Sequence, residues 1–365
     1  MSWLKLPFVL LINFTLICNL FQNCKAPEIE IQDQNFKNYL FTENTIDLNG
    51  DGKVDSKLDI NQNGKFEPNE AILLTELHLA FKNIGSIKGI EQFPNLELLD
   101  LMDNNLTALD LSYNLKLKVL ICSQNKITTL DLSNNIELTD LYCNNNPELR
   151  SLNLSKNSEL VNLETSYSHA LTLDISNCTK LKKLSANGNT FKNLSLNHCV
   201  DLEELDVRNC GLNQLDVGDN QKLIKLRVAN NRIEALNLTN NKLLEAIDAT
   251  DNHINQLDVS QCHNLNFLWC DNNKLRTLDL SNNPILGEVR CQNNQLYTVK
   301  LNNGSIKNLF WFQAYQNPQL SCIQVDDTTF AKSISDQTIP RTQDDAQWIV
   351  DKGVDFSLDC FNSDY

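Results

Sequence analysis

The 365-residue sequence predicts an α/β repeat solenoid, with a parallel β-sheet on the concave face and turns or extended chain on the convex face. Two observations predict this class. A pattern of leucines recurs about twelve times, and successive units begin roughly 21 residues apart. A unit of this length cannot bury its apolar side alone, so neighbouring units must stack. It also has no room for a long helix after a strand.

The pattern is clearest in the unit that begins at Leu265. With that leucine as position 1, apolar residues stand at positions 4, 6, 11, 14 and 16, and asparagines at positions 9 and 19. Positions 3 to 7 alternate outward and inward, which predicts a short strand with positions 4 and 6 facing the interior. We number every repeat in this way. The repeats begin at Leu74, Leu96, Leu117, Leu138, Leu160, Leu181, Leu202, Leu223, Leu244, Leu265, Leu286 and Leu309.

The position-9 asparagines predict a ladder inside the solenoid. A buried amide at a turn can bond backbone groups of adjacent repeats, and an apolar replacement would leave those groups unpaired. The ladder comprises Asn104, Asn125, Asn146, Asn189, Asn231, Asn252, Asn273, Asn294 and Asn317.

Eight cysteines lie on the repeat grid, in place of a core leucine at position 6 or of an asparagine at position 9 or 19. They are Cys122, Cys143, Cys270 and Cys291 at position 6, Cys210 at position 9, and Cys178, Cys199 and Cys262 at position 19. We interpret them as free thiols that act as small hydrophobes. A disulfide between the position-6 cysteines of adjacent repeats is the alternative. These cysteines form no C-x-x-C pair, so the sequence does not indicate a zinc site.

The first 23 residues predict a signal peptide, with one cation at Lys5 and an apolar stretch from Leu6 to Phe21. The segment resembles a bacterial lipoprotein signal with Cys24 as the lipidated residue, although Gln22 and Asn23 stand where small residues are usual. We therefore expect a surface lipoprotein of the cell envelope that meets the membrane only through this anchor. Simple secretion and an uncleaved anchor helix are the alternatives.

Residues 24–73 predict an N-terminal cap with a calcium loop. Asp59 to Glu70 matches the pattern D-x-N-x-N-G-x5-E, and Gly64 permits its sharp turn. The expected ligands are Asp59, Asn61, Asn63, the carbonyl of Lys65, Glu67 and Glu70. Residues 47–55 repeat the first half of the loop without the closing carboxylate. We expect Ca²⁺ to lock the cap onto the first repeat; the alternative is a polar connector.

Residues 74–321 make up the repeats, and residues 322–365 predict a C-terminal cap. A solenoid must cover its last apolar repeat and its exposed strand edge. Cys322 and Cys360 lie outside the repeat grid. In an oxidising compartment, a Cys322–Cys360 disulfide that closes this cap is the natural inference.

The outward positions 3, 5 and 7 near the C-terminal end form the candidate binding face. Four aromatic residues surround an arginine there, and aromatic residues and arginine dominate the energetics of interfaces. This set is Phe267, Trp269, Arg290, Trp311 and Tyr315. Protein and glycan ligands both suit it. The alternative is that the aromatic rings pack on the cap or on one another.

Charge and motif content limit the function classes. The 31 Lys and Arg against 46 Asp and Glu give a net charge of −15, which argues against nucleic acid and anionic membrane surfaces. No nucleophile elbow, phosphate loop or catalytic metal triad is present in the sequence, so we expect no enzyme. We expect a binding protein that is a monomer. A purely structural envelope spacer and an accessory domain of an enzyme are the other readings.

The short unit, with cysteine at position 6 and "LDLSNN" on its return leg, resembles bacterial surface leucine-rich repeats. These include the cysteine-containing internalins and related envelope proteins of Bacteroidota. The resemblance covers about two thirds of the chain. It implies a leucine-rich-repeat horseshoe that serves adhesion or ligand capture outside the cell without catalysis, and its C-terminal caps resemble the ending around Cys360.

Overall fold

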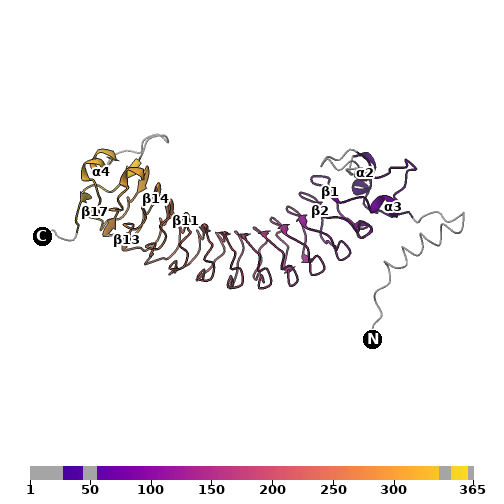
Figure 1. Ribbon diagram of the computed structural model, residues 1–365, viewed down its shortest axis with the longest axis horizontal. Helices are drawn as coiled ribbons and strands as arrows, with labels where there is room; N and C mark the ends of the chain where they lie inside the picture. Colours follow the sequence, from indigo (N-terminus) through magenta and orange to yellow (C-terminus); the bar gives the residue numbers. More distant parts are fainter. Residues whose placement is uncertain (1–27, 44–55, 337–346, 361–365) are drawn as a thin grey trace, which may run out of the picture.

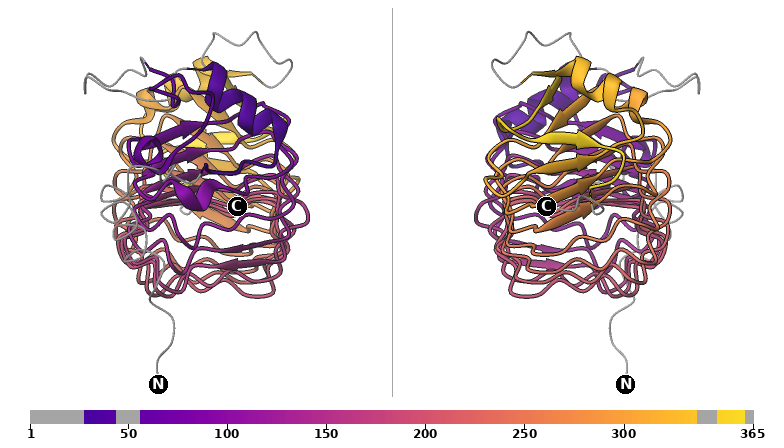
Figure 2. Two further views of the ribbon diagram at one scale, coloured as in Figure 1. Left: turned by 90° about the vertical axis from the view of Figure 1, so that its right-hand side faces the viewer. Right: turned by 90° about the vertical axis from the view of Figure 1, so that its left-hand side faces the viewer.

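The computed structural model describes residues 28–43, 56–336 and 347–360. The chain forms a curved rod of stacked turns, with one cap at each end (Figure 1). The predicted solenoid, with its parallel sheet on the concave face, is confirmed. Figure 2, seen along the rod, shows the turns surrounding a common interior.

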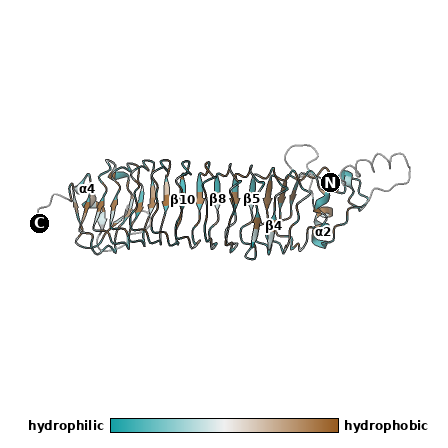
Figure 3. Ribbon diagram, turned by 90° about the horizontal axis from the view of Figure 1, so that it is seen from below, coloured by the Kyte–Doolittle hydropathy of each residue, from teal (hydrophilic) through white to brown (hydrophobic). Residues whose placement is uncertain are grey.

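The concave sheet has fourteen strands, and each strand pairs in parallel with its neighbours. Nearly all neighbouring strands come from successive repeats. In the twelve predicted repeats the strand is formed by positions 3 to 5. Figure 3 shows the strands side by side along the rod. Their order is β1 (Glu76–His78), β2 (Leu98–Asp100), β3 (Val119–Ile121), β5 (Asp140–Tyr142), β7 (Asn162–Glu164), β8 (Lys183–Ser185), β9 (Glu204–Asp206), β10 (Lys225–Arg227), β11 (Ala246–Asp248), β12 (Phe267–Trp269), β14 (Glu288–Arg290), β16 (Trp311–Gln313), β19 (Gln347–Ile349) and β18 (Ser335–Asp336).

The return legs contain more strand than the sequence predicts. A four-stranded parallel sheet combines β13 (Thr277–Asp279), β15 (Thr298–Lys300), β17 (Cys322–Gln324) and β20 (Asp355–Ser357). A second, smaller sheet pairs β4 (Thr129–Asp131) with β6 (Ser151–Asn153). Short 3-10 turns, η1 (Ile90–Gln92) and η2 (Ile306–Asn308), lie on two other legs. Stacking brings the return legs close enough for backbone pairing wherever their conformation is extended.

The position-9 asparagines form the predicted ladder, and all nine are buried. Asn273 is representative: its amide nitrogen donates to the carbonyls of Ala249 (2.9 Å) and Cys270 (3.1 Å), and its oxygen accepts from the backbone N–H of Ile254 (2.9 Å). One side chain therefore satisfies buried backbone groups in its own repeat and in the preceding one.

The position-19 asparagines form hydrogen bonds through the nitrogen of the side-chain amide but not through its oxygen. Asn283 donates to the carbonyls of Val259 (3.0 Å) and Cys262 (2.8 Å), whereas its buried oxygen has no partner. The same oxygen is unpartnered in Asn114, Asn135, Asn220 and Asn241, and in Asn157, which takes this place at position 20 of the longer repeat that begins at Leu138. Because no acceptor is needed here, a thiol can take the place, as Cys178, Cys199 and Cys262 do.

All eight cysteines on the repeat grid are free and buried, which supports the interpretation as small hydrophobes and not the alternative disulfides. Burial raises the pKa of the Cys143 thiol to about 12, and it likewise raises the pKa of Cys199 to about 11. The thiolate is the reactive form, so these groups are chemically quiet at neutral pH.

Position 8 has a left-handed backbone in every repeat, which the sequence pattern did not predict. The residues there are Phe81, Asp103, Gln124, Asn145, Tyr167, Gly188, Asn209, Asn230, Asp251, Asn272, Asn293 and Gln316. Asparagine, aspartate and glycine tolerate this conformation best, whereas an aromatic residue rarely adopts it. The turn that ends each strand therefore favours the Asn, Asp and Gly residues that occupy eight of the twelve positions.

The N-terminal cap packs α2 (Gln34–Thr42) and α3 (Pro68–Ala71) against the first repeat. Asp33 begins α2 by accepting from the backbone N–H groups of Asn35 and Phe36. Its second oxygen accepts from the N–H groups of Gly85 (2.9 Å) and Ser86 (3.2 Å). One carboxylate thus both starts the helix and fixes it to the repeat.

The C-terminal cap continues both sheets and covers the last repeat. Trp348 of β19 is fully buried, its ring centroid lies 5.0 Å from that of Phe312, and its indole N–H donates to the Leu309 carbonyl (2.9 Å). Helix α4 (Thr328–Ile334) packs on β20. The predicted disulfide joins Cys322 to Cys360, with their Cα atoms 5.9 Å apart.

Two substitutions on one repeat test the unequal roles of the two asparagine ladders. Asn273→Cys should destabilise the chain more than Asn283→Cys, because only the first leaves a backbone N–H, that of Ile254, without its acceptor. We expect a difference of about 1–3 kcal/mol in the free energy of unfolding, measured by urea denaturation. Equal losses would contradict the assignment of a donor-only role to position 19.

Removal of the disulfide tests the C-terminal cap. Cys322→Ser with Cys360→Ser opens a covalent link between residues 38 apart in sequence. We expect a loss of about 3 kcal/mol in stability and a lower Tm by calorimetry. A reducing agent should lower the Tm of the parent and leave that of the double variant unchanged. If the Tm of the parent does not fall on reduction, the bond does not stabilise the cap.

Candidate functional site

Four of the predicted binding residues lie on three adjacent strands of the concave sheet, and Tyr315 follows the third strand. In β12, β14 and β16, Phe267 pairs with Glu288 and then Trp311, while Trp269 pairs with Arg290 and then Gln313. Phe267, Trp269, Arg290, Trp311 and Tyr315 are all half-buried. We call these five residues the aromatic patch.

Glu288 organises the patch, and the sequence analysis did not select it. Its carboxylate oxygen Oε1 accepts from the indole N–H of Trp269 (3.0 Å) and from Nε and Nη2 of Arg290 (2.6 Å each). The Arg290 guanidinium lies 4.9 Å from the Trp269 ring centroid. A mostly buried carboxylate thus fixes a cation over an aromatic face, which sets the orientation of both side chains.

Asp271, at position 7 of the same repeat as Trp269, is the second residue that the sequence analysis left out of the site. It is buried, and its oxygens accept from the Thr250 hydroxyl (3.1 Å) and the Asn272 amide (3.0 Å). Burial raises the pKa of this carboxyl, and the charge of Arg290 partly opposes the shift. The signal that could have identified it is an acidic residue on an outward position beside an arginine.

The middle of the concave face is charged and internally paired. The Glu204 carboxylate lies 3.1 Å from the Lys225 ammonium and 3.7 Å from that of Lys183. On a neighbouring row, Arg208 and Asp206 approach within 2.7 Å. A shallow groove of about 360 Å³ runs over this region, between Tyr142 and Arg227. Asp206 is buried, whereas Glu204 and the cations are partly exposed, and together the pairs give the face a defined pattern of charge.

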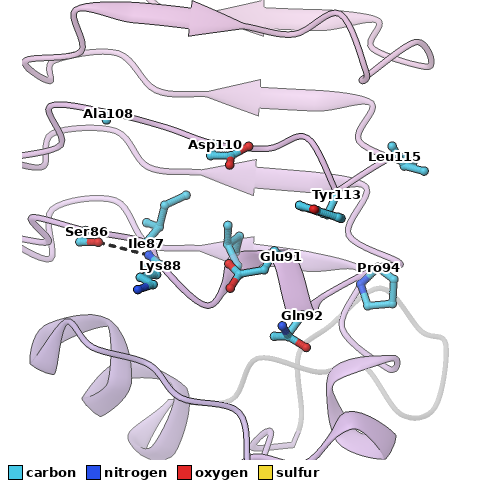
Figure 4. Close-up of a pocket in the computed structure, with 11 residues that line it drawn as sticks. Ser86, Ile87, Lys88, Glu91, Gln92, Pro94, Ala108, Asp110, Tyr113 and Leu115 are labelled. Atoms are coloured by element: carbon cyan, nitrogen blue, oxygen red, sulfur yellow. Dashed lines mark hydrogen bonds between the residues drawn. The ribbon is translucent and has the colours of Figure 1, made fainter. Parts of the chain in front are cut away.

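A larger groove lies away from the concave sheet, between the return legs of the first two repeats (Figure 4). It has a volume of about 760 Å³ and mostly apolar walls, which include Ile87, Pro94 and Tyr113. Lys88, Glu91 and Asp110 supply its charged groups. The sequence analysis did not predict this groove, because it depends on how the 3-10 turn η1 departs from the regular return leg.

The predicted calcium loop is closed by its own hydrogen bonds. Asp59 accepts from the backbone N–H groups of Asn63 (3.0 Å) and Gly64 (2.9 Å), and Asn61 donates to Glu67 (2.9 Å). Glu70 is buried and accepts from the backbone N–H of Ile60 (2.9 Å). The predicted side-chain oxygens therefore lie around one turn.

This donor set fits Ca²⁺ in its chemistry, because it consists of hard oxygen ligands on one loop with a glycine turn. Glu70 is the ligand that would have to turn from backbone N–H groups toward an ion, since its other oxygen accepts from Glu67 N–H (3.1 Å). Within the described residues, no three His, Cys, Asp or Glu side chains are already arranged to hold a metal ion.

Two of the predicted segments cannot be compared with the structure. The signal peptide with Cys24 and the half-loop at residues 47–55 lie outside the described residues. Among the residues that the structure describes, no helix is both long and apolar enough to span a bilayer.

Solved structures of leucine-rich-repeat proteins share this fold. The functional domain of InlJ from Listeria monocytogenes, which includes a cysteine ladder, aligns with a TM-score of 0.67 and 24% identity, over 90% of this chain and 72% of that one. The internalin InlF of the same species aligns at 0.57 and 24%, over 81% and 95%. A leucine-rich-repeat protein of Leptospira interrogans aligns at 0.59 and 24%, over 70% and 67%.

Two of the more distant structures are complexes. The Arabidopsis receptor kinase HAESA, solved with the peptide hormone IDA, has a TM-score of 0.58 and 18% identity, over 69% of this chain and 46% of that one. TLR13, solved with single-stranded RNA, has a TM-score of 0.52 and 15% identity, over 74% and 45%. No protein-family model matches the chain, and no curated protein matches it in sequence. At these identities the likeness establishes the leucine-rich-repeat fold.

Proposed function

We propose that the protein is a non-enzymatic binding or adhesion module that recognises a protein or glycan ligand through its concave face. The observation that carries this proposal is the aromatic patch, in which Glu288 fixes Arg290 over Trp269 on three adjacent strands. Pre-oriented aromatic and arginine side chains lose little entropy on binding. The leucine-rich-repeat receptor kinase HAESA, solved with a peptide hormone, supports a protein ligand.

RNA is the second ligand class that a structural neighbour raises, because TLR13 was solved with it. The net charge of −15 opposes a phosphate backbone, and Lys183, Lys225 and Arg208 in the middle of the concave face are already paired with carboxylates. We therefore favour protein or glycan.

The proposed place of action is the outside of the cell. The Cys322–Cys360 disulfide and the sequence of the first 23 residues support export to an oxidising compartment. We further propose a lipid anchor at Cys24, an envelope protein of the Bacteroidota type and a monomer in solution. Mass spectrometry of the mature N-terminus tests the anchor, and light scattering tests the monomer.

Replacement of two patch residues tests the binding face. Trp269→Ala with Trp311→Ala should weaken adhesion to the cognate surface at least about 100-fold, because two central aromatic side chains are lost. Binding is measured by incubating the labelled chain with arrays of glycans and of cell-surface proteins.

The matched control is Tyr113→Ala with Tyr297→Ala, which removes two exposed aromatic rings from the return legs. This control should bind like the parent. If the Trp269/Trp311 variant folds and still binds with parental affinity, the concave patch is not the binding face.

We also propose that Ca²⁺ binds the loop from Asp59 to Glu70 and stiffens the N-terminal cap. The support is the complete set of oxygen donors around Gly64. The loop lies directly against the cap, since the Phe66 carbonyl accepts from Ile29 N–H (2.8 Å) and Lys65 pairs with Glu28 (3.1 Å). A structural site with an affinity of about 10⁻⁴–10⁻³ M, typical of extracellular modules, would suffice.

Calcium titration of the Tm tests this proposal. The parent should gain thermal stability between 0.1 and 10 mM added CaCl₂, which brackets about 10⁻⁴–10⁻³ M, and Mg²⁺ should have a smaller effect. Glu70→Gln should lose the gain, whereas Glu91→Gln, outside the loop, should keep it. A parent whose Tm does not respond to Ca²⁺ has no such site.

A further inference from the structure

Gly287 stands beside the aromatic patch, at position 2 of its repeat. A Cβ at this residue would lie 2.7 Å from Cε1 of Phe310 and 2.6 Å from Oδ1 of Asn266. The Gly287 backbone is not left-handed, so its conformation does not require glycine. Because glycine has no side chain, it leaves space for the ring of Phe310. At position 2 most other repeats have a larger side chain, such as Glu97, Lys118 or Glu203.

Phe310 stands just before the start of strand β16, next to the aromatic patch in the chain. It directly precedes Trp311, and its backbone N–H donates to the Gly287 carbonyl (3.0 Å). The ring is 50% exposed although it packs against a neighbouring repeat. The ring rests on Gly287 and presents its remaining surface to solvent, one residue before Trp311 of the patch.

The charges around this surface are compensated. Arg290 is paired with Glu288 at 2.6 Å, and the buried Asp271 lies in the same region. Over β12, β14 and β16, Arg290 is the cation and it already has its counter-charge. An anionic ligand would meet two carboxylates within a chain of net charge −15. The surface is therefore suited to a ligand without charge, with apolar faces for the rings and hydroxyl groups for Glu288 and Gln313.

We propose that this surface binds a neutral polysaccharide, whose sugar rings stack on Phe310, Phe267 and Trp311. The inference rests on the proposed binding function and specifies its ligand. The C–H face of a pyranose is apolar and packs on an aromatic ring, while its hydroxyl groups bond carboxylates and amides. Phe267 and Trp311 lie two strands apart, about 10 Å, so successive rings of one glycan chain can contact both.

Affinity electrophoresis of the full chain provides the test. Native gels containing β-glucan, xyloglucan, xylan or mannan are compared with gels containing alginate, polygalacturonate or no polysaccharide. We expect retardation by at least one neutral polysaccharide and none by the two acidic ones. Retardation by the acidic polymers alone, or by none of the six gels, would overturn the inference.

Three variants show whether Phe310 and Gly287 act as argued. Phe310→Ala and Gly287→Ala should each weaken binding about 10-fold or more, the second by displacing the ring while every patch residue is kept. Phe310→Tyr keeps the ring and should bind like the parent. If both alanine variants keep the parental Tm and bind polysaccharide like the parent, Phe310 does not take part in binding.

The chain supplies its own matched control. Tyr167 rests on Gly188 in the same manner, since a Cβ there would lie 2.4 Å from the tyrosine ring, but this pair lies beside β7, far from the patch. Tyr167→Ala should leave polysaccharide binding unchanged. If no polysaccharide binds and the Trp269/Trp311 variant still loses adhesion to a protein surface, the glycan inference fails while the proposed binding function stands.

Discussion

The hydrogen bonding of the position-9 amide is the constraint on which the rest of the structure depends. Each of these asparagines joins the carbonyl of its own repeat to backbone groups of the repeat before it, as Asn125 does with Cys122, Leu101 and Leu106. Because these bonds recur in nine of the twelve repeats, they fix the spacing and the register between turns. The left-handed residue at position 8 and the parallel strand at positions 3 to 5 both follow from that fixed turn.

A periodic ladder needs an ending, and the two caps provide it with different chemistry. At the C-terminal end, the Asp351 carboxylate accepts from the backbone N–H groups of Gln316 (2.9 Å) and Asn317 (2.7 Å), where other repeats use the next turn. Trp348 fills the last core position and the disulfide holds β20 beside it. At the N-terminal end, Asp33 performs the equivalent role for Gly85 and Ser86.

The fixed register also explains how binding residues gather. Side chains at one position of successive repeats form a row with the strand spacing, so a few substitutions on adjacent repeats suffice to build a surface. Phe267, Trp269, Arg290 and Trp311 belong to two such rows. The scaffold is uniform and tolerant there, because positions 3 and 5 face away from the leucine core. Recognition can therefore change without disturbing the ladder.

The sequence by itself determined the repeat, the strand positions, the asparagine ladder and the pairing of Cys322 with Cys360, because each follows from a local pattern repeated many times or from two residues left outside it. Only the tertiary structure decided the role of Glu288, the donor-only use of position 19, the pairing of return legs and the contact between Phe310 and Gly287. These depend on distances between side chains in neighbouring repeats, and a one-dimensional pattern gives the row in which a residue lies but not the atom toward which it points.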